Sequence, residues 1–395
     1  MSFVDDAQLI LPDLIGLRRA IHADPELGLE VPRTQRRVLD ALTPLGLEVQ
    51  TGSGLSSVVA VLRGAHPGPT VVLRGDMDAL PMVEETGLEY ASTCAAMHAC
   101  GHDLHVAGLV GAARLLHARR DTLAGNVIFM FQPGEELGDG AAMMLAEGLL
   151  DAAGSAPVAA YGIHVVPGER GIFSTRPGAL MAGAAELVVT VHGRGGHGSM
   201  PHLTRDPVPV IAELITALQT FVTRRFDVFD PVVLSVTQLA AGGVARNVVA
   251  DAATLGATVR FLSAEACGRL QRELPGLVNG IAAAHGCTAE LEFELVSPAT
   301  VNDVVLTPAA LATLRALFGT ERVWESAAPV MGSEDFSHVL ERVPGAFIFL
   351  RATPVEIDLE QAAPNHSSRV LFDDSVLADQ AAALAELAWS HLGVA

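Results

Sequence analysis

The chain has 395 residues, and chains of this length usually divide into more than one hydrophobic core, so we expect about two domains. Its 45 acidic residues outnumber its 25 basic residues, and the net charge of -20 repels the phosphates of nucleic acids and anionic lipids. Every basic residue is arginine, and the absence of lysine excludes pyridoxal Schiff bases, Walker-type phosphate loops and serine–lysine dyads. We therefore expect neither a nucleic acid nor a membrane as a partner.

The N-terminal sequence MSFVDDAQLI lacks the basic region and the apolar core of a secretory signal. No uncharged apolar stretch is long enough to span a bilayer. Four cysteines, widely spaced along the chain, do not suggest a disulfide framework. These features together predict a cytoplasmic protein.

The first third of the chain alternates helical and strand-like patterns. Helical spacing covers 13–29, 33–42 and 105–120, and apolar runs typical of buried strands cover 56–64, 70–80, 126–136 and 159–166. This alternation predicts an α/β domain with a mixed, mainly parallel sheet covered by helices. Open α/β sheets bind ligands at the carboxyl edge of their strands, where several of these runs place acidic or imidazole groups: Asp76, Asp78, Glu135, Glu136 and His164.

The pattern changes near residue 183. Strand-like and helical runs from there to about 296 indicate a unit of α+β type, which we predict to be a second domain inserted into the first. The chain then returns with a helix over 306–318, a strand over 346–352 and a helix over 375–392. The first domain would thus comprise 1–182 and 297–395, and the inserted domain 183–296.

The segment MHACGHDLH, residues 97–105, is rich in groups that bind metals. Cys100 and His102 lie two apart just before a predicted helix, where an extended backbone points alternate side chains in the same direction. A helix N-terminus also favours the thiolate form of a cysteine. The pair suits a cation, although a buried thiol beside a polar helix start fits the same residues. His98 and His105 are interpreted as structural groups or as supports of a ligand.

Two adjacent carboxylates follow an apolar strand in QPGEE, where burial without a cation or a proton is costly. They suggest a division of labour in which one glutamate binds a metal and the other is a general base, although an exposed pair would simply be solvated. Asp78 in RGDMDALP is interpreted as a carboxylate that orients a ligand or the catalytic glutamate, or as a turn residue. His164 and His366 could each be an ordinary histidine with satisfied hydrogen bonds. Counted with Cys100, His102 and one glutamate, however, they give a donor set that fits one or two transition metals.

Eight motifs occur in the order found in one enzyme family: RGDMDALPM, MHACGHDLHVA, QPGEE, GIHVVPG, GRGGHGSMPH, ARNVVAD, MGSEDFS and NHSS. Over nearly its whole length the chain resembles metal-dependent amidohydrolases of the aminoacylase and carboxypeptidase superfamily. It is most similar to the branch that holds hippurate hydrolase, N-acyl-amino-acid amidohydrolases and indole-acetyl-amino-acid hydrolases. The resemblance implies cleavage of an N-acyl amino acid to a carboxylic acid and a free amino acid.

The resemblance also implies a role for each matching residue. Two divalent ions, manganese or zinc with cobalt and nickel as alternatives, would activate a water as the nucleophile and would be held by five ligands: Cys100, His102, Glu136, His164 and His366. Glu135 would be the general base and later the acid, and Asp78 would stand behind the site. Asp76 occupies a position at which other branches have a metal-binding histidine, so its role stays open.

The inserted domain resembles the lid and dimerisation domain of the family, which implies a homodimer or a dimer-based oligomer. His197 would reach an active site, usually that of the partner subunit, and would stabilise an oxyanion. Asn247 and Arg260 match positions that contact the substrate in related carboxypeptidases. An arginine facing the substrate would pair with an α-carboxylate, which favours N-acylated amino acids over neutral amides.

Three other functions fit some of the same residues. A dipeptidase or carboxypeptidase with the same metals would differ only in what fills the acyl pocket. A thiol hydrolase with Cys100 as its nucleophile would be indifferent to chelators. A binding protein on an inactive amidohydrolase scaffold would hold a ligand without turnover, although the presence of Glu135 and of all five ligands argues against it.

Overall fold

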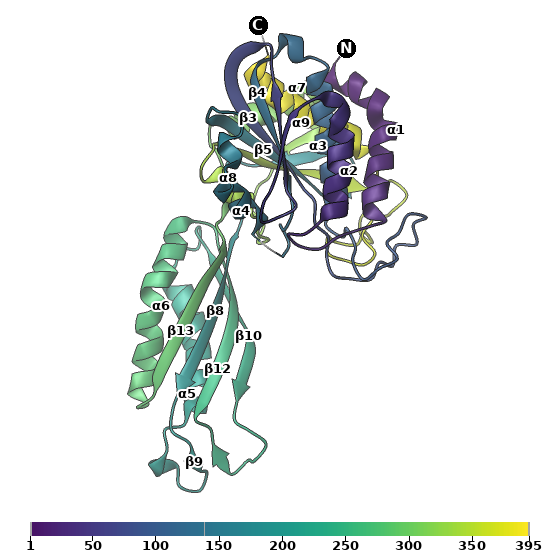
Figure 1. The fold of residues 1–395 in the computed structure, drawn as a ribbon. Coiled ribbons are helices and arrows are strands. Elements are labelled where there is room, and N and C mark those ends of the chain that lie inside the picture. The colour runs from purple at the N-terminus through teal and green to yellow at the C-terminus, as the bar shows by residue number, and fades with distance from the viewer. Residues whose placement is uncertain (1, 138, 394–395) are drawn as a thin grey trace. The chain divides into compact units, whose positions relative to one another are not determined.

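The computed structural model describes residues 2–137 and 139–393, which form two compact units (Figure 1). The first unit comprises Met1–Leu180, Val301–Ala328 and Asp335–Ala395, and the second comprises Met181–Thr300 and Pro329–Glu334. Residues 183–296, predicted to form an inserted domain, therefore lie within the second unit. No helix in the described part of the chain combines the length and the apolar character needed to cross a lipid bilayer.

The first unit is built on an eight-stranded sheet with the order β1-β2-β4-β3-β5-β16-β6-β15. The central strand β3 is parallel to β4 and to β5, β5 is parallel to β16, and β6 is parallel to β15. The pairs β1–β2, β2–β4 and β6–β16 are antiparallel. The predicted mixed, mainly parallel sheet is therefore confirmed. The strands are β1 (Glu48–Thr51), β2 (Val58–Arg63), β3 (His66–Asp76), β4 (Ala124–Gln132), β5 (Pro157–Glu169), β6 (Phe173–Thr175), β15 (Val323–Glu325) and β16 (Gly345–Thr353).

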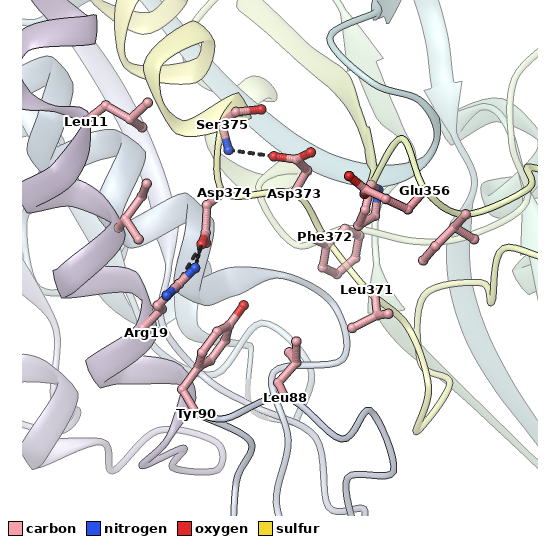
Figure 2. A pocket seen from close by; sticks show the side chains of 13 residues that line it. Leu11, Arg19, Leu88, Tyr90, Glu356, Leu371, Phe372, Asp373, Asp374 and Ser375 are labelled. Carbon is pink, nitrogen blue, oxygen red and sulfur yellow. Dashed lines mark hydrogen bonds and ion pairs between the residues drawn. The ribbon is translucent and has the colours of Figure 1, made fainter.

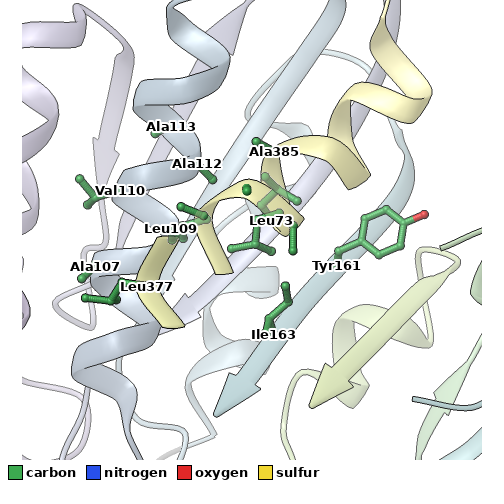
Figure 3. Packing of buried hydrophobic residues seen from close by; sticks show 14 of the residues in the cluster. Leu73, Ala107, Leu109, Val110, Ala112, Ala113, Tyr161, Ile163, Leu377 and Ala385 are labelled. Carbon is green, nitrogen blue, oxygen red and sulfur yellow. The ribbon is translucent and has the colours of Figure 1, made fainter. Parts of the chain in front are cut away.

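Helices cover this sheet because its central strands are apolar on both faces. The helices α3 and α9 pack directly on β3 and β5, where Leu73 and Ile163 meet Leu109 and Leu377 (Figure 3). The helix α1 packs on α3 and α9, outside the sheet layer. The helices of this unit are α1 (Phe3–His22), α2 (Pro32–Leu42), α3 (His102–His117), α4 (Gly140–Ala146), α7 (Leu306–Phe318), α8 (Ser337–Leu340) and α9 (Val376–Leu392).

The first helix differs from the expected range of 13–29. It begins ten residues earlier, because Ser2 and Asp5 form a capping box in which each side chain bonds the backbone N–H of the other residue. It ends at His22, just before Asp24, whose helical conformation the following proline disfavours. The expected range was therefore wrong at both ends.

The second unit holds a four-stranded antiparallel sheet with the order β10-β12-β8-β13 and two long helices (Figure 1). Alternate apolar residues of the sheet pack on α5 and α6 in a core of their own. A two-residue strand pair, β9 with β11, lies in the same unit. These elements are β8 (Gly183–His192), β9 (Gly196–His197), α5 (Pro207–Arg225), β10 (Val232–Ala241), β11 (Val248–Val249), β12 (Ala252–Phe261), α6 (Ala264–Ala284) and β13 (Thr288–Ser297), and the short strands β7 (Gly178–Met181) and β14 (Thr300–Asn302) stand where the chain passes between units.

A pocket of about 540 Å³ opens on the first unit between α1 and the segments 88–90, 354–357 and 371–375 (Figure 2). Two of its acidic groups have partners, since Asp374 pairs with Arg19 and Asp373 accepts a hydrogen bond from the Ser375 N–H. None of the site residues predicted from the sequence lines it. The candidate site therefore lies elsewhere in this unit.

Candidate metal centre

Two neighbouring strands deliver carboxylates to one edge of the sheet. The strand β3 ends at Asp76, with Asp78 two residues further on, and β4 ends just before the turn that carries Glu135 and Glu136. This agrees with the expected pattern of polar groups after buried strands. His164 departs from it, because pairing with β16 extends β5 as far as Glu169 and leaves His164 inside the strand.

Cys100 and His102 flank a glycine whose conformation the site requires. Gly101 has a φ of +85° and precedes the first residue of α3, so this helix begins at His102 and not at residue 105 as expected. A Cβ at Gly101 would lie 2.3 Å from Val165 Cγ2, which no real side chain tolerates. Glycine therefore lets the loop that carries both predicted ligands approach β5 closely.

The five predicted ligands converge in the first unit. Cys100 Sγ lies 3.4 Å from His164 Nε2 and 3.3 Å from His366 Nε2. Glu136 Oε1 lies 3.1 Å from His366 Nε2 and 3.9 Å from His102 Nε2. Such spacings are those of donor atoms that share a cation at about 2.0–2.3 Å, the ligand distance for sulfur, nitrogen and oxygen on zinc.

Several donor atoms of this cluster are buried without a well-aligned hydrogen bond in the described chain: both ring nitrogens of His102 and Oε1 of Glu136. Buried polar atoms of this kind are costly unless another group satisfies them. One thiolate, three imidazoles and one carboxylate form a donor set typical of zinc and of neighbouring transition metals. The residues present therefore fit a metal centre.

The electrostatics of the cluster also favour a cation. Cys100 and Glu136, both close to Nε2 of His366, raise the pKa of this imidazole to about 10, which indicates an excess of negative charge that a cation would neutralise. Burial alone would lower the pKa of His102, but the Asp76 carboxylate and other nearby groups outweigh it and raise that pKa well above its ordinary value. Burial lowers the pKa of His164 well below the ordinary range, which leaves the neutral imidazole that metals bind.

Asp78 contacts both groups that it was predicted to orient. Its Oδ1 and Oδ2 accept hydrogen bonds from the backbone N–H groups of Glu135 and Glu136, at 3.1 and 3.0 Å. Its Oδ1 also lies 3.4 Å from His102 Nδ1. One buried carboxylate thus holds the backbone of the glutamate pair and faces a ligand ring.

Asn365 is a site residue that the sequence reasoning missed. Its Nδ2 lies 3.5 Å from Cys100 Sγ and 3.3 Å from the Val165 carbonyl oxygen. The neighbouring His366 has a φ of +66°, which is rare for a residue other than glycine, and its N–H donates to the Ala99 carbonyl at 3.0 Å. The position of Asn365 next to a ligand in NHSS was the available signal.

A buried network of charged side chains lies next to the loop that carries Cys100 and His102. The sequence reasoning missed this network as well. Asp103, next to His102, accepts hydrogen bonds from Arg18 Nε at 2.7 Å and from His22 Nδ1 at 2.8 Å. The other ring nitrogen of His22 contacts Glu84, and Arg18 also bonds Tyr90 and Asp374. These contacts join α1 to the start of α3, and the long sequence separation of the partners hid them.

This network predicts a pH dependence of stability. Burial lowers the pKa of His22, but Asp103 outweighs it and raises the pKa to about 9. Because this value exceeds the ordinary value of 6.5, the stabilisation is complete below pH 6.5 and is lost as the pH rises through 9. We expect His22→Gln to cost on the order of 2–3 kcal/mol at pH 6.5 and much less at pH 10.

Urea denaturation followed by tryptophan fluorescence would measure this difference in the first unit, which holds both tryptophans, Trp324 and Trp389. The exposed His66→Gln variant is the matched control and should change stability little at either pH. An equal loss of stability for His22→Gln at pH 6.5 and pH 10 would contradict the assignment.

The three remaining predicted residues belong to the second unit. His197 is exposed on β9, and its Nδ1 accepts the Ser199 N–H at 3.1 Å, so a neutral ring carries its proton on Nε2. Asn247 lies beside it, since its carbonyl accepts the Gly198 N–H at 2.8 Å. Arg260 lies apart from both on β12, where its guanidinium bonds Thr258 Oγ1 and the Val259 carbonyl.

Comparison with known proteins identifies the family. The profile of peptidase family M20/M25/M40 matches residues 72–390, which include all five predicted ligands. The chain belongs to this peptidase family. The recognition of a metal-dependent hydrolase family from its motifs is thereby confirmed, and the protein is an M20 hydrolase.

Three relatives illustrate the range of the M20 family near this chain. Thermostable carboxypeptidase 1 of Saccharolobus solfataricus is 37% identical over 379 residues, which is 94% of each chain. An IAA-amino acid hydrolase of Arabidopsis thaliana is 36% identical over 387 residues, 96% of this chain and 85% of its own. The YxeP structure of Bacillus subtilis, described as a dinuclear metal-binding M20 peptidase, is 30% identical, with a TM-score of 0.82 over 96% of this chain and 98% of its own.

Proposed function

We propose that this M20 hydrolase cleaves the amide bond of N-acyl amino acids and releases a carboxylic acid and a free amino acid. The observation that carries the proposal is the paired backbone hydrogen bonds of Asp78, which fix Glu135 beside the ligand Glu136. A family relative is named for the hydrolysis of an amino acid conjugate, which supports this substrate class.

Five residues would hold two divalent ions, manganese or zinc: Cys100, His102, Glu136, His164 and His366. The chemistry that such ions supply when bound is a lowered pKa for a coordinated water and polarisation of the amide carbonyl. Glu135 takes a proton from the attacking water and later returns it to the nitrogen of the leaving amino acid. Its backbone is already held in place, so no reorganisation of the turn is required.

The second unit would supply the groups that recognise the substrate. The hydrogen-bonding partners of His197 leave Nε2–H as a donor for the oxyanion of the tetrahedral intermediate. Arg260 would bind the α-carboxylate of the substrate. Asn247, which lies beside His197, would contact the carboxylate or the scissile carbonyl. In the proposed homodimer, His197 serves the active site of the partner subunit.

A carboxypeptidase activity is the second candidate function, because the relative that is 37% identical is named a thermostable carboxypeptidase. It needs the same metal centre and the same carboxylate recognition, and it differs in the group on the acyl side. A panel of N-acetyl, N-benzoyl and indole-acetyl amino acids and of dipeptides would separate the two. The proposal requires higher kcat/KM values for N-acyl amino acids than for dipeptides with the same C-terminal residue.

Metal removal is expected to abolish turnover of the best substrate in this panel. Chelation followed by gel filtration should lower the rate at least about 100-fold, since the lowered pKa of water depends on the ions. Addition of manganese or zinc should restore it, and elemental analysis should give two ions per chain. Full activity of the chelated protein would exclude the metal mechanism and would favour a Cys100 thiol hydrolase.

A further inference from the structure

A side chain replaces a missing strand partner next to the metal centre. Registered pairing of β3 with β5 stops at Arg74 and Gly162, so β3 offers no partner to the part of β5 beyond that pair. There the Val165 N–H donates to Nε2 of His105 at 2.8 Å. The imidazole of α3 thus satisfies the β5 backbone directly after His164.

The hydrogen bonds of His105 fix its tautomer. A backbone N–H can only donate, so Nε2 of His105 accepts and the ring proton resides on Nδ1. That Nδ1 lies 2.5 Å from Oδ1 of Asp76 and donates to it. Both ring nitrogens are therefore occupied, and His105 is not a metal ligand although its ring centroid lies 4.5 Å from that of His164.

Asp76 is in turn held from the other side. Its Oδ2 accepts a hydrogen bond from Arg74 Nη1 at 2.8 Å, and both side chains are buried. The Arg74 guanidinium also donates to Gln132 Oε1 at 2.9 Å, which anchors it to β4. The buried cation compensates the Asp76 charge, so this carboxylate can stay ionised and keep its hydrogen bond with His105.

The same Val165 residue orients a predicted metal ligand. Its carbonyl oxygen accepts a hydrogen bond from His164 Nδ1 at 2.8 Å. The proton of His164 is therefore on Nδ1, and the lone pair of Nε2 faces Cys100 Sγ at 3.4 Å. The Val165 backbone thus links the two histidines. Its N–H is bound by His105, and its carbonyl oxygen orients His164.

We propose that Asp76 and His105 are positioning residues for His164: together they hold the Val165 backbone, which aims Nε2 of His164 at the metal centre. This inference rests on the metal centre of the proposed function. It assigns a role to Asp76, which stands where other branches of the superfamily have a metal-binding histidine. Its Oδ2 also lies 3.2 Å from Nε2 of the predicted ligand His102, so Asp76 borders the metal centre while its Oδ1 holds His105.

Two substitutions separate the two halves of the His105 contact. A glutamine amide reaches the position of Nε2 and retains an acceptor for the Val165 N–H, whereas an asparagine amide reaches only the position of Nδ1 and retains the contact with Asp76. Calorimetric titration of the metal-free protein with zinc alone would measure both sites. We expect His105→Asn to lower the zinc affinity of one of the two sites about 10–100-fold. His105→Gln should lower the affinity of that site less than tenfold.

The same variants loaded with cobalt provide a second measurement, because the visible absorption of Co²⁺ reports its ligand geometry. His105→Asn should change this spectrum, whereas His117→Asn, on the same helix α3, should change neither the spectrum nor zinc binding. Equal zinc affinities of the Asn and Gln variants, or wild-type affinities in the Asn variant, would overturn the inference.

If His105→Asn does not fold, His105→Gln still tests the inference, because the inference requires the His105→Gln protein to bind two ions. Binding of only one ion by a folded Gln variant would contradict it. Failure of the wild-type protein to bind zinc would overturn the proposed metal centre itself. If the wild type binds two ions and His105→Asn binds both with wild-type affinity, only the positioning role is overturned.

Discussion

Replacing Glu135 with glutamine is expected to lower kcat by about 10²–10⁴-fold while two divalent ions remain bound. Glutamine keeps the size of the side chain but cannot take a proton from water or return it to the leaving nitrogen. The hydrogen bond from the residue 135 backbone N–H to Asp78 does not depend on the side chain, so the turn should stay in place. Glu136, the predicted ligand, is unchanged.

Steady-state kinetics with the best N-acyl amino acid and elemental analysis of the same preparation would test this. Glu89→Gln, an exposed position in the same unit, makes the same change of charge and should keep the wild-type kcat. Near-normal turnover by the Glu135→Gln variant would show that Glu135 is not the general base. Loss of bound metal in that variant would instead make Glu135 a ligand.

Replacing Cys100 with serine is expected to remove at least one of the two ions and to lower kcat/KM at least about 100-fold. A hydroxyl binds a soft or borderline metal far more weakly than a thiolate does. Cys100 Sγ lies within 3.4 Å of Nε2 of both His164 and His366, so a weaker donor here affects ligands from two segments of the chain. Serine is slightly smaller than cysteine, so the packing of the buried loop should change little.

Elemental analysis distinguishes the metal mechanism from a thiol hydrolase. The proposed function predicts a lower metal content, whereas a nucleophilic Cys100 predicts loss of activity with no dependence on metal. Cys94→Ser is the matched control, because Cys94 is an exposed free thiol in the same unit. Unchanged metal content in Cys100→Ser would exclude Cys100 as a ligand.

Local patterns predicted the parts of this structure that depend on short stretches of chain. The apolar runs predicted the strands that end near Asp78 and Glu135, because a strand buried on both faces must consist of consecutive apolar residues. The donors of the metal cluster could be selected because thiols, imidazoles and paired carboxylates are costly to bury without a partner. Order along the chain then sufficed to select Cys100 and His366 as candidates, although 266 residues separate them.

Other features depend on partners that no local pattern encodes. His164 lies inside β5 because β16, nearly 200 residues later, extends that strand by pairing with it. The contact of Arg18 with Asp103 crosses 85 residues, and a sequence offers no rule that selects this arginine among 25. The hydrogen bond of the Val165 N–H to Nε2 of His105 likewise depends on where β3 stops pairing with β5. That point is a property of the assembled sheet.

The predicted ligands of the metal centre come from residues 100 to 366, and the residues Met181–Thr300 of the second unit stand between them in the sequence. During synthesis on the ribosome, Met181–Thr300 emerges as one continuous piece before His366 has been translated, so it can fold first. Binding of the proposed ions would therefore be a late event, after nearly the whole polypeptide has left the ribosome. Until then Cys100 would be an unprotected thiol, so we expect a nascent chain to be more vulnerable to oxidants than the finished, metal-loaded enzyme.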